Sequence, residues 1–172
     1  GLIGGLAWSA SAWRVGGRDR WIGWSDAARA ENLTQVVCNS RFLLLPGLKV
    51  PHLASHVLGL GAKRLTRDWQ ERYGIDPVLL ETYVDISRFK GTSYRAANWI
   101  DAGVTKGRGR HDRRHEARAS VKRIFLLPLR PDAREILRRS HAPAVPAPVC
   151  GAADWTQQEF GAVDLGDKRL NR

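Results

Sequence analysis

Strand-sized apolar runs alternate with helical stripes along this chain, and that alternation is what most restricts its fold. The runs at 41–48, 78–84 and 121–129 have the length of buried strands, and apolar residues between them recur at helical spacing. Strands that alternate with helices form layers around one core. We therefore predict an α/β domain with a mixed, twisted sheet and flanking helices. The chain of 172 residues is long enough for one such core and too short for two large ones.

Capping and turn residues set the remaining boundaries. Ser25 and Thr92 can accept hydrogen bonds at helix starts, Pro51 suits a first helical turn, and Gly74 suits a helix end. The predicted elements are a strand at 2–15, a turn at 16–19, a second strand or packed loop at 21–24, helix 27–37, strand 41–48, helix 51–74, strand 78–84, helix 93–99, strand 121–129 and a basic helical end at 134–139. The tryptophans expected in the core are Trp8, Trp13, Trp69 and Trp99.

Several classes of protein are excluded at this level. No apolar run approaches the ~18 residues of a membrane span, so we expect no membrane contact. Cys38 and Cys150 lie far apart, which suits a reducing bacterial cytoplasm rather than a disulfide framework. The chain has no methionine and runs from Gly1 straight into an apolar stretch. We expect it to lack N-terminal elements of the domain.

The charge of the chain is unevenly distributed. Lys and Arg total 28 against 17 Asp and Glu, a net charge of +11. Residues 106–139 hold 12 basic and 4 acidic side chains, whereas residues 1–105 hold 13 and 9. This pattern favours contact with a polyanion such as a nucleic-acid backbone; the alternative is a solvated basic loop. The cations expected to contact phosphates in this segment are Lys106, Arg108, Arg110, Arg113, Arg114 and Arg118.

Two motifs suggest an enzyme, and each has a simpler interpretation. Tyr94, early in a short helix after a buried strand, could act as a general acid, or could bury its ring and leave its hydroxyl in water. Gly59 and Gly61, shortly after His56, could cradle a pyrophosphate at a helix start. Because the predicted helix begins near Pro51, both glycines would lie inside it, where close helix–sheet packing explains them.

Metal ligands are weakly indicated. Glu81, Asp85 and Asp101 lie at strand ends beside the basic segment and could hold Mg²⁺; a cap and an edge ion pair are the alternative. His52 and His56 stand four apart, without a third ligand at a telling distance. We predict no metal site and no cofactor.

Residues 1–130 resemble the DruA family, named for a component of the Druantia anti-phage system. The stretches that carry this resemblance are RWIGWSD at 20–26, NSRFL at 39–43, LASHV at 53–57, RFKGTSYRAANW at 88–99 and GVTKGRGR at 103–110. The resembling region makes up about three-quarters of the chain. The resemblance implies a DruA-like domain over 1–139 and a role in bacterial defence.

The same region is similar, more weakly, to the GNAT acetyltransferase architecture. The order strand, long helix, strand, short helix and strand matches, and Tyr94 to Trp99 matches the aromatic motif of that family. His56 stands where an Arg or Gln would open its pyrophosphate motif. The resemblance implies a GNAT-like fold that lacks its N-terminal part. An acyl-CoA-dependent N-acetyltransferase that uses Tyr94 is therefore the alternative function.

Residues 152–172 look like the N-terminal DNA-binding segment of Tn-five-type bacterial transposases. A Trp, a short helix to an aromatic residue, and then LGDKR carry this resemblance, which follows a Pro/Ala-rich linker at 140–151. It implies a short C-terminal helical segment that contacts DNA. The residues expected to do so are Trp155, Lys168, Arg169 and Arg172.

Together these features predict a DNA-binding protein of mobile-element or anti-phage origin. We expect a DruA-like domain joined to the start of a transposase DNA-binding segment, with contacts to the DNA backbone. Other mobile-element or defence-system proteins are the further partners expected, and no complete catalytic site is visible.

Overall fold

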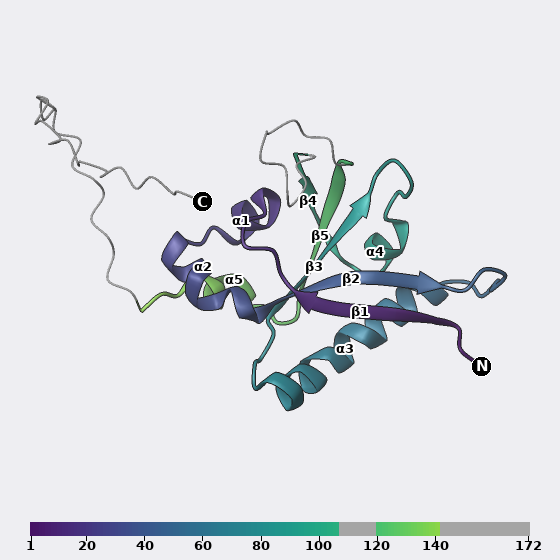
Figure 1. Ribbon diagram of the computed structural model, residues 1–172, viewed down its shortest axis with the longest axis horizontal. Coiled ribbons are helices and arrows are strands. Elements are labelled where there is room, and N and C mark those ends of the chain that lie inside the picture. Colours follow the sequence, from purple (N-terminus) through teal and green to yellow (C-terminus); the bar gives the residue numbers. More distant parts are fainter. Residues whose placement is uncertain (107–119, 142–172) are drawn as a thin grey trace, which may run out of the picture.

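The computed structural model describes residues 1–106 and 120–141. The elements in chain order are β1 (Gly4–Ala10), α1 (Gly16–Ile22), α2 (Asp26–Asn32), a 3-10 turn (Leu33–Gln35), β2 (Val36–Leu44), α3 (Leu53–Tyr73), β3 (Leu79–Asp85), α4 (Thr92–Ala96), β4 (Ile100–Val104), β5 (Lys122–Pro128) and α5 (Ala133–Arg138). The strands form one sheet in the order β1-β2-β3-β5-β4 (Figure 1). Among these described strands only β2 and β3 run parallel; the other neighbours are antiparallel. The predicted α/β class, with a mixed sheet and flanking helices, is confirmed.

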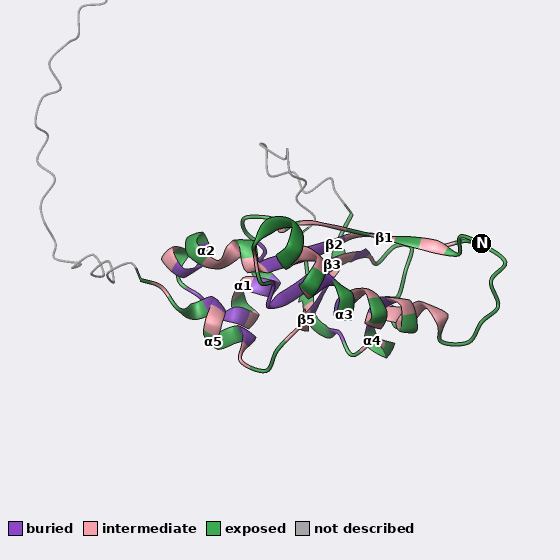
Figure 2. Ribbon diagram, turned by 90° about the horizontal axis from the view of Figure 1, so that it is seen from below, coloured by how far each residue is buried: buried purple, intermediate pink, exposed green. Residues whose placement is uncertain are grey.

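Helices cover the sheet on both faces, and the alternation of β3 shows how. Leu79 packs in a cluster with residues of α1, α2 and α5, whereas Leu80 and Val84 pack in a second cluster with residues of α3 and α4. Successive residues of a strand point to opposite faces, which is why one strand serves both clusters. Figure 2 shows the buried residues gathered along β2 and β3. No helix in the described part of the chain has both the length and the apolar composition that crossing a bilayer requires.

The sheet divides where β2 and β3 separate. Their parallel pairing runs only from Val36 with Leu79 to Asn39 with Thr82. Beyond that point β2 continues paired with β1 as a two-stranded ribbon, and β3 continues beside β5 (Figure 1). The carboxyl ends of β2 and β3 therefore lie on separate arms of the sheet.

The long helix and its end are confirmed, but it begins at Leu53 rather than at Pro51. α3 ends at Gly74, whose φ of 67° lies in the left-handed region that glycine adopts without strain. Ser25 caps α2 through a hydrogen bond from the Ala28 amide of 3.1 Å. The helix predicted over 27–37 ends earlier than expected, at Asn32, because Val36 already begins β2. The buried part of that strand is Val36–Asn39, so the prediction of a buried strand over 41–48 is wrong in position.

The predicted turn at 16–19 and second strand or loop at 21–24 are replaced by α1. The Asp19 side chain accepts a hydrogen bond from the Val15 amide at 3.0 Å, which stabilises the start of this helix, and Gly23 ends it at a φ of 73°. The glycines that suggested a turn serve packing. A Cβ at Gly17 would lie 2.4 Å from the Ala102 carbonyl oxygen, so only glycine lets α1 approach β4.

Two further elements are shorter than predicted. β1 ends at Ala10, whereas the strand was expected over 2–15. α4 ends at Ala96, whereas the helix was expected over 93–99, and Gly91 rather than Thr92 stands at its N-cap.

β4 and one tryptophan also differ from the sequence-based expectation. β4, which was not predicted, is a short edge strand with an irregular register between Asp101 and Val104, so it shows no alternating pattern. Trp13, predicted in the core, is 52% exposed. Trp99 is buried, and Trp8 and Trp69 pack partly buried against the second cluster, as predicted.

Candidate functional site

Cations from four separate segments meet at one end of the sheet, where β3 and β4 end and β5 begins. The pairing of Asp85 with Lys122 and of Val104 with Arg123 brings these strand ends together. The loop after β3 and the short helix α4 add further cations at the same end. We call this group the basic end; its members are Arg88, Lys90, Arg95, Lys106, Lys122 and Arg123.

Among the described residues, the carboxylates of Asp85 and Asp101 lie at this end, and both accept hydrogen bonds. Asp101 accepts hydrogen bonds from Arg123 at 2.7 Å and from Arg95 at 3.2 Å. Partial burial opposes ionisation of Asp101, but these bonds and one from the Gly103 amide outweigh it, so the pKa of Asp101 lies below its usual value. Hydrogen bonds from the Ser87 hydroxyl and amide likewise lower the pKa of Asp85. Both groups therefore carry a negative charge at neutral pH.

Four cations of the basic end form no ion pair with a carboxylate of the described residues, although the charge of Lys122 contributes to lowering the pKa of Asp85. Within residues 1–106 and 120–141, no ion pair holds Arg88, Lys90, Lys106 or Lys122. All four side chains belong to exposed residues. Asp101 is shared by Arg95 and Arg123, so the basic end presents a net positive surface to solvent.

Of the residues predicted to contact phosphates, the structure describes Lys106 alone. Lys106 is exposed at the end of the segment that follows β4. Arg108, Arg110, Arg113, Arg114 and Arg118 lie outside the described residues, as do Trp155, Lys168, Arg169 and Arg172. The chain leaves the basic end at Lys106 and returns to it at Ser120, where the Lys122 amide bonds to Thr105 at 3.0 Å. Arg88 and Lys90 were not among the predicted contacts, although the run Arg88-Phe89-Lys90 shows cations on both sides of an aromatic residue.

Tyr94 lies in the core at the point where β2 and β3 separate. Its hydroxyl donates to the Asn39 side-chain oxygen at 2.8 Å, and the Thr82 hydroxyl donates to the Asn39 carbonyl at 3.0 Å. The ring stacks on Phe125 with centroids 5.7 Å apart. Burial raises the pKa of Tyr94. The ring is in the core, as one of the two interpretations expected, but the hydroxyl is bonded inside the protein rather than in water.

The two glycines after His56 lie inside α3. Their amides therefore fall in the interior of a helix, where N–H groups bond to the preceding turn and cannot hold a phosphate. A Cβ at Gly61 would lie 2.5 Å from a Leu6 methyl group, so this glycine permits close contact between α3 and β1. Gly59 has open space around it.

A buried ionic network on the opposite face of the sheet was not predicted. Arg18 and Glu81 are both fully buried and form an ion pair of 3.1 Å. The Tyr83 hydroxyl donates to the other Glu81 oxygen at 2.6 Å, and Arg18 also binds Asp19 at 2.9 Å. Glu81 was expected at an edge or on Mg²⁺; it is instead the internal partner of Arg18. In the described part of the chain, no three His, Cys, Asp or Glu side chains gather as a metal site would require.

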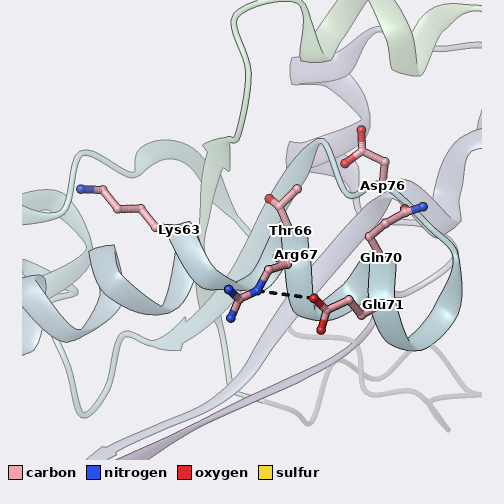
Figure 3. Close-up of a pocket in the computed structure, with 6 residues that line it drawn as sticks. All are labelled: Lys63, Thr66, Arg67, Gln70, Glu71 and Asp76. Atoms are coloured by element: carbon pink, nitrogen blue, oxygen red, sulfur yellow. Dashed lines mark ion pairs between the residues drawn. The ribbon is translucent and has the colours of Figure 1, made fainter.

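The surface hollow along the second half of α3 offers a comparison with the basic end. It has a volume of about 540 Å³ and is lined by Lys63, Thr66, Arg67, Gln70, Glu71 and Asp76 (Figure 3). Arg67 and Glu71, one turn apart on α3, form an ion pair of 3.6 Å at its edge. Two cations face two acids there, so this hollow has no preference for a polyanion.

A family model described as Druantia protein DruA matches residues 1–119. The chain belongs to the DruA family. This membership associates the chain with anti-phage defence. A comparison with curated proteins and one with solved structures each returned no match. The matched region of this DruA-family chain contains β1 to β4, and β5 completes the sheet between β3 and β4 from outside it.

Proposed function

We propose that this DruA-family chain binds DNA through the phosphate backbone, with the basic end of the sheet as the contact surface. The observation that carries the proposal is a group of exposed cations that form no ion pair among the described residues. They come from the loop after β3, the end of β4 and the start of β5. Cations placed in this way release counterions from DNA when they contact phosphates. Such contacts position a protein without reading sequence.

The sequence between Lys106 and Ser120 carries more positive charge. The segment 107–119, which connects the two described strands at the basic end, carries Arg108, Arg110, Arg113, Arg114 and Arg118 against one Asp and one Glu. Arginine suits phosphate because its planar guanidinium can donate two parallel hydrogen bonds. Invading DNA is a ligand that fits the association of the family with anti-phage defence.

The transposase-like segment would add a second contact. Residues 152–172 carry Lys168, Arg169 and Arg172 within five positions, after the Pro/Ala-rich linker at 140–151. A proline-rich linker is extended and semi-rigid, so it would let this segment reach a neighbouring stretch of the same DNA. We therefore propose a fusion in which both parts contact the backbone. Removing residues 142–172 should weaken DNA binding and reduce its salt dependence without abolishing either.

Salt dependence of duplex binding tests the proposal. A variant with Lys90→Gln, Lys106→Gln and Lys122→Gln should bind a labelled duplex more weakly. The slope of log Kobs against log salt should become about 2 to 3 smaller in magnitude, because each lost phosphate contact contributes about 0.9.

The matched control removes the same charge elsewhere. Lys49→Gln, Lys63→Gln and Arg72→Gln replace three exposed cations outside the basic end, and should leave the slope almost unchanged. If both triple variants lose affinity equally, the binding is a general effect of net charge and the basic end is not the contact surface. Affinity that does not depend on salt would refute backbone binding altogether.

A further inference from the structure

An exposed phenylalanine stands among the cations of the basic end. Phe89 is 58% exposed. The Arg88 guanidinium lies 5.3 Å from the centroid of its ring, and Lys90 follows directly in the chain. No aromatic ring in the described part of the chain packs against it. Singly exposed apolar side chains are common on protein surfaces, so Phe89 matters here because its ring lies beside cations.

The turn that presents Phe89 is held at both ends. At its start, the Asp85 side chain accepts hydrogen bonds from the Ser87 amide and hydroxyl at 3.0 and 2.6 Å. The Phe89 amide donates to the Asp85 carbonyl at 2.9 Å. At its end, Gly91 has a φ of 72° and lies so close to Phe125 that an added Cβ would be 2.5 Å from the ring. The ring is thus displayed from an anchored turn.

Other exposed apolar side chains lie in the same segments as these cations. Ile86, Val104 and Val121 are 44%, 46% and 39% exposed. The Ile86 amide donates to the Val121 carbonyl at 3.3 Å, which joins the loop after β3 to the start of β5. The basic end therefore exposes apolar groups as well as cations.

This mixture distinguishes two forms of nucleic acid. A duplex offers phosphates on its outside but keeps the faces of its bases stacked within. A single strand offers both, and proteins that bind single strands combine cations along the backbone with aromatic rings on which bases stack. We propose that the basic end takes single-stranded nucleic acid in preference to duplex, with Phe89 stacking on an unpaired base while Lys90 and Lys122 contact phosphates. The proposal deepens, and rests on, the proposed binding of DNA.

The experiment compares three labelled probes on the full chain: an oligo(dT) strand of about 15 nucleotides, an oligo(rU) strand of the same length, and a blunt duplex of the same length. Phe89→Ala should weaken oligo(dT) binding roughly 5-fold or more, since one base–aromatic stack contributes about that factor at least. Duplex binding should change less than about 2-fold. The salt dependence should stay as it is, because no charge is removed. The oligo(rU) probe shows whether the strand is DNA, RNA or either.

Two further variants separate stacking from other effects. Phe89→Trp keeps a flat aromatic face and should retain binding, whereas Phe89→Leu keeps only the apolar contact and should behave like Phe89→Ala. The matched control is Tyr73→Ala: Tyr73 is 53% exposed and has the Arg72 guanidinium 5.7 Å from its ring centroid, but it ends α3 before β3 begins. It should not alter binding of any probe.

The outcomes distinguish the two proposals. If the duplex binds with steep salt dependence while Phe89→Ala binds oligo(dT) as well as the Tyr73→Ala control, the backbone contact stands and the single-strand proposal is overturned. The single-strand proposal is equally overturned if Phe89→Ala weakens binding of the duplex and of the single strand by the same factor. If the unmodified chain binds none of the probes, both proposals fail.

Discussion

Replacing Glu81 by alanine removes the carboxylate that neutralises Arg18 inside the core. Both side chains are 0% exposed, and 3.1 Å separates the guanidinium from the carboxylate. Removing one partner of a buried ion pair costs about 3–5 kcal/mol, because the other charge stays buried without its partner. Arg18 retains Asp19 at 2.9 Å, and the side chain of Asp19 is only 19% exposed. We therefore expect the lower end of that range, about 3 kcal/mol, which corresponds to a fall in Tm of about 6–12 °C.

Urea denaturation followed by circular dichroism measures this loss. The double variant Arg18→Met, Glu81→Leu should recover most of the stability, since apolar residues of similar volume replace a buried pair at little cost. The control is Arg64→Ala, which breaks an exposed ion pair of 2.8 Å with Asp68. The side chains of Arg64 and Asp68 are 70% and 43% exposed. Exposed pairs contribute at most about 1 kcal/mol.

Two results would refute this reasoning about Arg18 and Glu81. The first is a loss below about 1 kcal/mol for Glu81→Ala. It would mean that Asp19 and the carbonyls of Ala12 and Trp13, to which Arg18 donates at 2.8 and 3.2 Å, suffice for the guanidinium. The second is a double variant as unstable as the sum of its single variants, which would mean that the two side chains act independently.

Three further predictions concern other parts of the fold. Gly59→Ala should stabilise the chain by about 0.5–1 kcal/mol, because glycine loses more backbone entropy than alanine in a helix and the added methyl group meets no other atom. Gly91→Ala should destabilise it by roughly 2 kcal/mol or more, because Gly91 has a φ of 72° and the added methyl group would collide with the Phe125 ring. Urea denaturation measures both changes. The pKa of Asp101 is lowered in the folded chain, so its ion pairs stabilise the fold above its unfolded pKa of about 3.8 and are lost as the pH falls through the folded value. Below about pH 4, the Tm of Asp101→Asn should therefore fall less steeply with pH than the Tm of the unchanged chain. Measuring Tm as a function of pH for both proteins tests this. Burial, with a smaller contribution from Glu81, raises the pKa of the Cys38 thiol to about 12, so in a Cys150→Ser background a thiol reagent should react at pH 8 only after urea is added.

Local signals predicted the parts of the fold that depend on local chemistry. The stripe of apolar residues and the final glycine of α3 lie within one continuous segment, as does the bond from Ser25 to the start of α2. The sequence does not show that both faces of β3 are buried, because the helices and strands that cover them come from distant segments. Glu81 is 63 residues from Arg18, and nothing near either residue indicates that they pair.

The candidate site shows the same division. The excess of arginine between 106 and 123 is visible by counting, and it predicted a surface of positive charge. That Arg88 and Lys90 join it depends on β3 ending beside the start of β5, which is a property of the sheet order. The glycines of α1 were interpreted as a turn because their use, close approach to β4, requires knowing that β4 exists.

The position of β5 governs how this chain can assemble during its synthesis. β3 and β4 leave the ribosome before β5, which is the last of the described strands in the chain. In the sheet β3 and β4 do not pair with each other, because β5 lies between them. Until residues 122–128 emerge, β3 has one open side and β4 lacks the neighbour with which it pairs in the described sheet. Pairing between distant segments slows folding. Until β5 pairs with them, β3 and β4 expose backbone N–H and C=O groups that lack these partners. A chain truncated before Ser120 would keep β1, β2 and β3 in one sheet and leave β4 without the strand that holds it there.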